Sequence, residues 1–167
     1  GAEHVLVVAV PQYCVAVLYV DGEVDKLLKA GTHAYWNFRR DVRVELVDTR
    51  LQVLEVAGQE ILTRDKVALR INLTAGYRVA DVLAAHAKQA KPVDFLYKEL
   101  QFGLRAAVGT RTLDELRENK GAIDEGVEAH VRRRVMGSGL EVESVGVKDI
   151  ILPGEMKANL AKVVEAE

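Results

Sequence analysis

Apolar residues alternate strictly with polar or small residues from Val67 to Val79. The apolar series consists of Val67, Leu69, Ile71, Leu73, Ala75, Tyr77 and Val79. Because successive side chains of a β-strand point to opposite faces, this period of two predicts a strand with one buried face. The stretch is well above the usual strand length of about five or six residues, which favours an elongated sheet over a compact barrel.

Other stretches also have the composition of strands. Residues 13–20 are rich in β-forming residues and end at Asp21-Gly22, a strong hairpin-turn signal. Lys29–His33 is interpreted as a second turn, and alternation resumes over 42–46. Leu51–Ile61 is predicted to be extended. The first third of the chain is therefore expected to be mainly strands.

A further strand is expected near the end of the chain. Leu140 and Val142 alternate, but Val145 and Val147 fall on the opposite parity. A β-bulge near Ser144 would produce this slip, because one extra residue reverses the faces of all that follow.

Between these strands the apolar period changes to that of a helix. Asp81 can cap a helix that stops near Pro92, a second helix starts near Asp94, and Thr112 opens a third, short one. The residues that share the apolar faces of the second and fourth helices are Leu96, Leu100, Leu104, Ala107, Ile123, Val127, Val131 and Val135. Their spacing of three and four predicts amphipathic helices, and Gly137–Gly139 ends the fourth.

Pro153 ends the last strand and fits the first turn of a final helix. Met156, Leu160 and Val163 lie on one side of it at heptad spacing. The pattern leaves two interpretations open, a core-packing helix or the beginning of a coiled coil. In the second, these three residues are the expected oligomer interface.

Composition restricts the class of protein. The chain has 167 residues, of which 49% are hydrophobic and 29% charged, as expected for one globular domain. A net charge of −2 lacks the excess of basic residues expected of a nucleic-acid-binding domain. A single cysteine, Cys14, excludes an internal disulfide framework. The apolar stretch Val5–Val20 is interrupted by Pro11, so it does not form a complete membrane helix. Because Gly1 replaces an initiating methionine, we expect the chain to be a piece of a longer protein.

Candidate chemistry is sparse. The four histidines form no recognised metal-ligand arrangement, and the glycines around Ser138 lack the spacing of a nucleophile elbow. We expect no catalytic residue, no metal and no cofactor. The basic run His130–Arg134 is interpreted as a solvated helix face, with acidic lipid headgroups or a neighbouring subunit as alternatives.

Several stretches together resemble the SPFH, or prohibitin-homology (PHB), domain of the stomatin/prohibitin/flotillin superfamily, and they are closest to the prokaryotic slipins. The matching stretches are Val20–Gly22, Ala30–His33, Gln59–Val67, Leu104-Arg105, Gly109-Thr110, Leu113–Leu116 and Val142–Pro153. Their order and spacing also fit. The chain departs from the stomatin pattern at Ala57-Gly58, where stomatins usually have a proline pair.

The resemblance implies an α+β fold, with an elongated, mostly antiparallel sheet and about four amphipathic helices that lead into a C-terminal coiled coil. It places the SPFH/PHB domain at residues 1–153 and the start of the coiled coil at 154–167. It also implies a membrane-associated scaffold that binds copies of itself, and lipids through an anchor outside this fragment. The expected location is the plasma membrane of a prokaryote, with the domain in the aqueous phase on the cytoplasmic face.

Three functions remain to be weighed. The first is an oligomeric scaffold that organises membrane microdomains and regulates membrane proteins. The second is a dedicated regulatory subunit of a membrane-bound serine protease, which differs in having one specific partner. The third is an enzyme, for which the sequence supplies no nucleophile–base pair.

Overall fold

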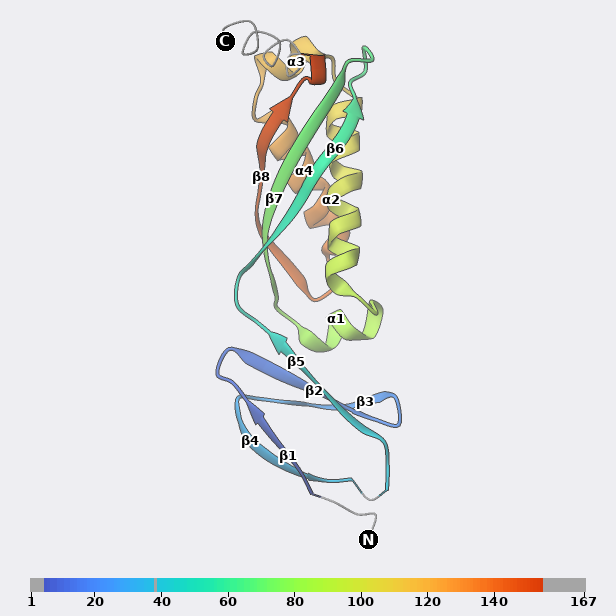
Figure 1. Cartoon of the computed structure of the whole chain (residues 1–167), viewed down its shortest axis with the longest axis vertical. Helices are drawn as coiled ribbons and strands as arrows, with labels where there is room; N and C mark the ends of the chain where they lie inside the picture. The colour runs from blue at the N-terminus through green and yellow to red at the C-terminus, as the bar shows by residue number, and fades with distance from the viewer. Residues whose placement is uncertain (1–4, 38, 155–167) are drawn as a thin grey trace, which may run out of the picture. The chain divides into compact units, whose positions relative to one another are not determined.

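A computed structural model describes residues 5–37 and 39–154, and it divides into two units by internal contacts (Figure 1). Unit 1 comprises Gly1–Leu51, Arg78–Ala90 and Gly137–Glu141; unit 2 comprises Gln52–Tyr77, Lys91–Met136 and Val142–Glu167. The strands are β1 (Val5–Val10), β2 (Cys14–Val20), β3 (Glu23–Leu28), β4 (Gly31–Trp36), β5 (Val42–Asp48), β6 (Gln52–Leu62), β7 (Ala68–Val79) and β8 (Leu140–Ile151). The helices are α1 (Val82–Lys88), α2 (Pro92–Gly109), α3 (Leu113–Glu118) and α4 (Ala122–Val135). The fold is α+β, as expected.

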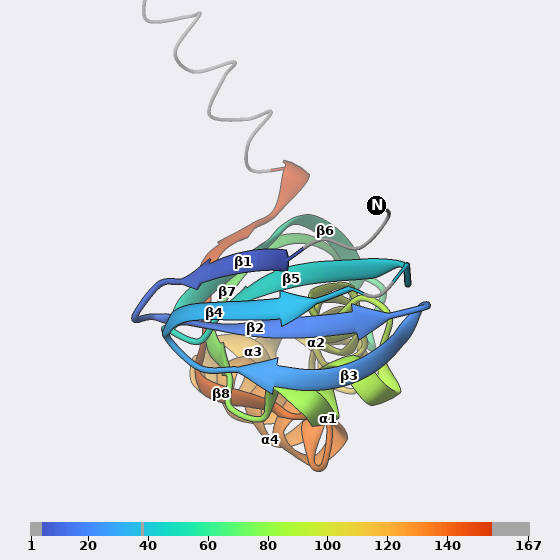
Figure 2. The same ribbon diagram turned by 90° about the horizontal axis from the view of Figure 1, so that it is seen from below.

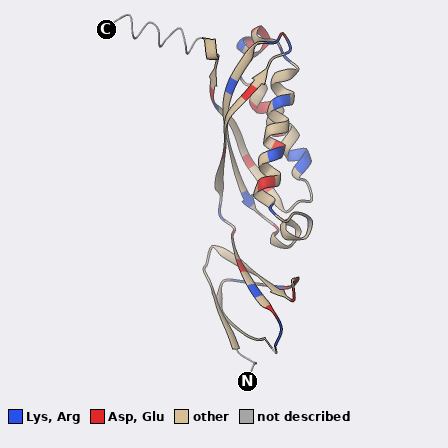
Figure 3. Ribbon diagram, turned by 45° about the vertical axis from the view of Figure 1, so that its right-hand side comes forward, with Lys and Arg blue, Asp and Glu red and all other residues tan. Residues whose placement is uncertain are grey.

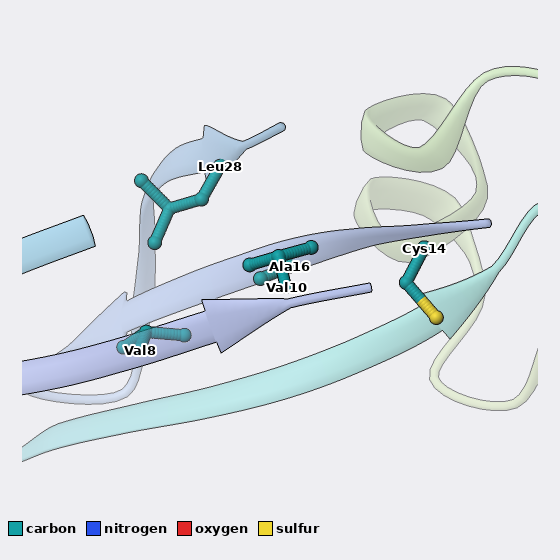
Figure 4. Packing of buried hydrophobic residues seen from close by; sticks show 5 residues of the cluster. All are labelled: Val8, Val10, Cys14, Ala16 and Leu28. Carbon is teal, nitrogen blue, oxygen red and sulfur yellow. The ribbon is translucent and has the colours of Figure 1, made fainter. Parts of the chain in front are cut away.

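Unit 1 contains two small sheets, whose strands run across Figure 2. Strand β1 pairs with β4, and β2 lies between β3 and β5; all of these pairs are antiparallel. Between the two sheets lies an apolar cluster of Val8, Val10, Cys14, Ala16 and Leu28 (Figure 4). Cys14 is therefore a buried, free cysteine within this cluster.

Unit 2 consists of a sheet in the order β6-β7-β8, with α2 and α4 packed together against one face of it (Figure 1). The expected apolar faces of both helices are buried, and so are alternate residues of β7. In β8, Val142 and Val145 are both buried while Glu143 and Ser144 are exposed, so the predicted change of parity occurs where expected. The antiparallel strands are thus distributed over three sheets of the described chain.

Local capping signals were interpreted correctly. The Asp81 side chain accepts a hydrogen bond from the N–H of Ala84, and Thr112 accepts one from the N–H of Glu115. Asp21 and Gly22 both have positive φ, at 51° and 85°, as a tight hairpin turn requires.

Two boundaries were predicted wrongly. The second turn is confined to Lys29 and Ala30, because Gly31–His33 already pair with β1 as part of β4. The second helix begins at Pro92 rather than near Asp94, since proline fits the first helical turn, where its missing N–H is not needed. Residues 153 and 154 are helical, but Met156, Leu160 and Val163 lie outside the described residues, so the coiled-coil prediction stays untested.

Candidate functional site: an interaction surface

The turn between β6 and β7 lies within Gln59–Val67, one of the stretches that carry the family resemblance. Thr63 is only 1% exposed, and its hydroxyl donates a hydrogen bond to Asp65 Oδ1 over 2.6 Å. The same hydroxyl accepts one from the N–H of Val67 over 2.9 Å, which closes the turn. Chiefly because of the Thr63 hydroxyl, and also because of the Leu113 N–H, the pKa of Asp65 lies below its ordinary value; desolvation opposes this shift.

This turn is attached to the segment between α2 and α3. The N–H of Arg64 donates to the carbonyl of Arg111, and its guanidinium donates to the carbonyl of Thr110 and to Glu115 Oε1. Asp65 Oδ1 accepts from the N–H of Leu113 over 3.1 Å. Two motifs that lie about fifty residues apart in sequence are therefore hydrogen-bonded to each other, and their polar groups hold the two segments together.

The Ala57-Gly58 pair, which stands where stomatins usually have two prolines, has a local structural explanation. The β6–β7 register shifts between Val56 and Gln59, and Gly58 has a φ of 63°. The N–H of Gly58 donates to Asn72 Oδ1 over 2.7 Å. Proline at position 58 could adopt neither this φ nor this hydrogen bond, so glycine suits the bulge formed here.

An apolar groove of about 390 Å³ lies in unit 2, between α3, the start of α4 and the end of β8. Its apolar lining includes Leu69, Leu113, Leu116, Ile123, Ile150 and Leu152. Charged residues on its rim include Arg117, Lys120 and Lys148, with Asp124 and Asp149. Asp124 also accepts a hydrogen bond from the N–H of Val147. A groove of this kind can hold apolar side chains of a partner.

The sequence did not reveal this groove, because its lining comes from four segments that only the fold brings together. A short helix that opens at Thr112 and contains Leu113 and Leu116 was predicted, but its pattern does not tell a core face from an open one. A helix as short as α3 gives too few turns for such a distinction.

The basic run on α4 is largely engaged within unit 2. Glu99 of α2 is only 5% exposed, and its Oε2 lies 3.1 Å from His130 Nε2 and 3.2 Å from Arg134 Nε. Arg132 donates to the carbonyls of Val142 and Glu143 and pairs with Glu128. The run is thus more than a solvated face, because three of its members connect α4 to α2, β8 or its own helix.

The other candidate side chains make local structural contacts. His33 Nε2 lies 2.7 Å from the carbonyl oxygen of Lys29, and His86 Nδ1 lies 3.0 Å from that of Val82. Ser138 is buried, and its Oγ accepts a hydrogen bond from the N–H of Leu140. His4 is outside the described residues. Within the ranges 5–37 and 39–154, no group of three or more His, Cys, Asp or Glu side chains is arranged to hold a metal ion.

None of the helices in the described part of the chain is both long and apolar enough to cross a membrane.

The comparison with known protein families gives one result that covers nearly the whole chain. Residues 8–167 match the model of the SPFH domain / Band 7 family. This range includes every stretch on which the resemblance was based.

Individual relatives agree with that match. A stomatin homolog of Pyrococcus abyssi is 32% identical over 122 residues, which cover 73% of this chain and 46% of the relative. Stomatin-3 of Caenorhabditis elegans is 34% identical over 121 residues, or 72% of this chain and 45% of the relative. An uncharacterized protein of Methanocaldococcus jannaschii is 30% identical over 161 residues, or 96% of this chain and 80% of the relative.

The chain thus spans a little under half the length of the two stomatin-type relatives. The family match and these relatives agree with the motif positions and with the α+β fold. The chain belongs to the SPFH domain / Band 7 family.

Proposed function

We propose that this chain is the SPFH domain of a membrane-associated, stomatin-type scaffold, which assembles with copies of itself and organises lipids and partner proteins around it. The observation that carries the proposal is the family match over residues 8–167, supported by relatives named as stomatins. The proposed location is the cytoplasmic face of a prokaryotic plasma membrane.

The geometry of unit 2 supports a role in binding. The polar residues of its motifs hold the β6–β7 turn against the α2–α3 segment, so their hydrogen-bonding capacity is used within the domain. Near them lies the apolar groove with charged residues on its rim. Such a surface suits a protein partner more than a small reacting substrate.

The proposed mechanism relies on effective concentration. A single lateral contact between two domains is weak. Attachment to a bilayer confines the domains to a thin layer, which raises the effective concentration of neighbouring domains and so favours contact between them. A head-to-tail contact repeated with a constant rotation closes into a ring. A coiled coil that follows the domain would add further contacts between neighbours.

The test is the size of the full-length parent protein after extraction from membranes with a mild detergent. A large assembly, measured by light scattering on a sizing column, is expected; a monomer would contradict the scaffold. The proteins that co-purify distinguish the general scaffold from the second hypothesis, a dedicated regulatory subunit of a membrane-bound serine protease. A single serine protease present in equal amount would favour the second hypothesis.

A further inference from the structure

The apolar groove of unit 2 lies beside the point where β8 leads into the last part of the chain. Ile150 and Leu152 belong to its lining, and residues 153 and 154, which follow at once, are helical. Residues 155–167 lie outside the described residues and are here called the terminal segment. No intervening loop separates this segment from the groove in sequence.

The apolar residues of the terminal segment continue the spacing of that lining. Met156, Leu160 and Val163 follow Leu152 at intervals of four, four and three residues. Such intervals place side chains on one side of a helix. In the helix predicted from Pro153 onward, these three side chains therefore share the side of Leu152, which lines the groove.

The groove offers an apolar surface on which these side chains can pack. Its volume is about 390 Å³, and Ile150 in its lining remains 44% exposed although it is large and apolar. Full burial of a leucine or methionine side chain changes an equilibrium constant by about tenfold or more. Contact with even part of the terminal segment would thus be favourable.

The charges on the rim favour an acidic segment. Asp124 already accepts a hydrogen bond from a backbone N–H of β8. Arg117 and Lys120 are exposed and form no ion pair in the ranges 5–37 and 39–154. Figure 3 shows both basic and acidic residues at the end of unit 2 that carries α3. The terminal segment has glutamates before and after its apolar residues, namely Glu155, Glu165 and Glu167.

A helix as short as the terminal segment needs a partner for its apolar side. Isolated helices of fewer than about 12–15 residues are marginal in water, and packing supplies most of the stability of helices in proteins. In an assembly, the partner can be the equivalent helix of a neighbouring copy, as in a coiled coil. In the free chain, the groove is the apolar surface that lies next to the segment in sequence.

We infer that the groove is the docking site of the terminal segment of the same chain, with Met156, Leu160 and Val163 packed against α3 and the end of β8. Docking and coiled-coil formation then compete for the same three side chains. The free chain is held back from self-association until neighbouring copies are dense enough to displace the segment from the groove. This regulation of assembly rests on the proposed scaffold function, whereas the docking itself does not.

Hydrogen–deuterium exchange of the 167-residue chain tests the docking with two matched variants. Leu160→Asp places a carboxylate on the apolar side of the terminal segment, whereas Ala158→Asp places one on the opposite side of the same predicted helix. Leu160→Asp is expected to speed exchange of the α3 amides by about tenfold, because the segment no longer covers α3. Ala158→Asp should leave that exchange unchanged. Circular dichroism spectra confirm that both variants fold.

A substitution in the groove should release the segment in the same way. Ile150→Asp introduces a charge at a partly exposed position of the lining, and Val53→Asp is its control, at a 70% exposed valine of β6 in unit 2. Only Ile150→Asp should speed exchange of the terminal segment. The two releasing variants should differ in self-association: Ile150→Asp frees an intact segment and increases crosslinking between copies, whereas Leu160→Asp removes a coiled-coil contact and decreases it.

An equimolar mixture of the Ile150→Asp and Leu160→Asp chains distinguishes docking within one chain from docking between copies. The first chain has an intact segment and the second an intact groove. Docking within one chain predicts that each chain exchanges in the mixture as it does alone. Slower exchange in the mixture would show that the segment of one copy occupies the groove of another, and would overturn the inference.

Unchanged exchange of α3 in Leu160→Asp, or equal effects of Leu160→Asp and Ala158→Asp, would also contradict the docking. The same holds if the terminal segment exchanges equally in Ile150→Asp and Val53→Asp. These outcomes differ from a failure of the proposed function. A parent protein that forms a large assembly without this docking retains the scaffold, whereas a monomeric parent with measurable docking loses the scaffold alone.

Discussion

Asp65 shows how a motif residue of this domain acts through hydrogen bonds of the folded state. The hydroxyl of Thr63 and the N–H of Leu113 both stabilise its charged carboxylate, and they lower its pKa from the ordinary 3.8. A depressed folded-state pKa adds stability at pH values above the unfolded-state pKa, and this contribution is lost as the pH falls through the folded-state value.

We therefore predict that Asp65→Asn lowers the free energy of unfolding most at neutral pH. The difference from the parent chain should begin to shrink below about pH 4 and vanish as the pH falls through the folded-state pKa of Asp65, because its carboxyl group is then protonated first in the unfolded and finally in the folded state. Urea unfolding curves over a series of pH values measure this. Thr63→Val removes the main cause of the lowered pKa, so the free energy of unfolding of this variant should also vary less with pH than that of the parent chain. A stability difference between Asp65→Asn and the parent chain that is constant with pH would contradict this explanation.

Gly139 illustrates a second kind of residue requirement, close backbone approach. Its φ is 81°, and a Cβ atom there would lie 2.3 Å from the carbonyl oxygen of Asp81 and 2.6 Å from the N atom of Ala85. Gly22 has a similar φ of 85°, but a Cβ atom would have nothing within 4 Å. The two glycines thus separate backbone strain from steric exclusion.

Substitution by alanine should separate these effects. Gly22→Ala is expected to lower the free energy of unfolding by about 1 kcal/mol, from the left-handed conformation alone. Gly139→Ala should lower it by at least about 2 kcal/mol more, because backbone atoms at the start of α1 must move. Thermal or urea denaturation of the two variants provides the measurement, and equal losses would show that the close approach is relieved without strain.

Residue-scale features were predictable to the extent that they are local. The caps Asp81 and Thr112 were found because side chain and N–H partner are three residues apart. Gly139 was predicted only as part of a helix stop, since its contact with Asp81 joins segments far apart in sequence. The same holds for the contact of Asp65 with Leu113.

At the scale of elements, periodicity succeeded where one face is clearly buried. The strict alternation in β7 and the spacing of three and four in α2 and α4 reproduce the observed burial. Strands β1 and β4 gave no such signal, because residues 5–10 are apolar on both faces and the sequence of β4 starts with an apparent turn. The exposed apolar residues of β1 and β4 were missed for this reason.

The contact between α2 and α4 includes the buried carboxylate of Glu99 with His130 and Arg134. A buried charge without partners is strongly destabilising, whereas its replacement by an apolar group of similar size is often tolerated. We predict that His130→Leu with Arg134→Met lowers the free energy of unfolding by about 3 kcal/mol. Adding Glu99→Leu should recover most of the loss, because no charge is then left buried.

Urea denaturation of the parent, the double and the triple variant tests this rescue. Glu99→Leu alone is the necessary control, since it shows the effect of the substitution while the cations can still be hydrated. If the triple variant is less stable than the double variant, Glu99 contributes by packing rather than by charge.

At the scale of the whole molecule, the family could be predicted from the order of motifs, and the comparisons confirm it over residues 8–167. The groove in unit 2 could not, because β7, α3, α4 and β8 each contribute only one to a few of its residues. The expected interface at Met156, Leu160 and Val163 lies beyond the described residues. Assembly therefore has to be argued from physical chemistry and tested on the molecule.

Assembly by confinement makes a prediction for this 167-residue chain. Free in solution, it should be monomeric or weakly dimeric, because one lateral contact does not compensate for the entropy lost on association. Attached through an N-terminal histidine tag to vesicles that contain nickel-chelating lipid, the same amount of protein should give ladders of oligomers after brief chemical crosslinking. The ladders should disappear when the tagged chain is diluted over excess vesicle surface, since only the density of neighbours changes. Ladders that persist at low density would instead indicate an intrinsic oligomer, and crosslinking that is equal with and without vesicles would remove confinement from the mechanism.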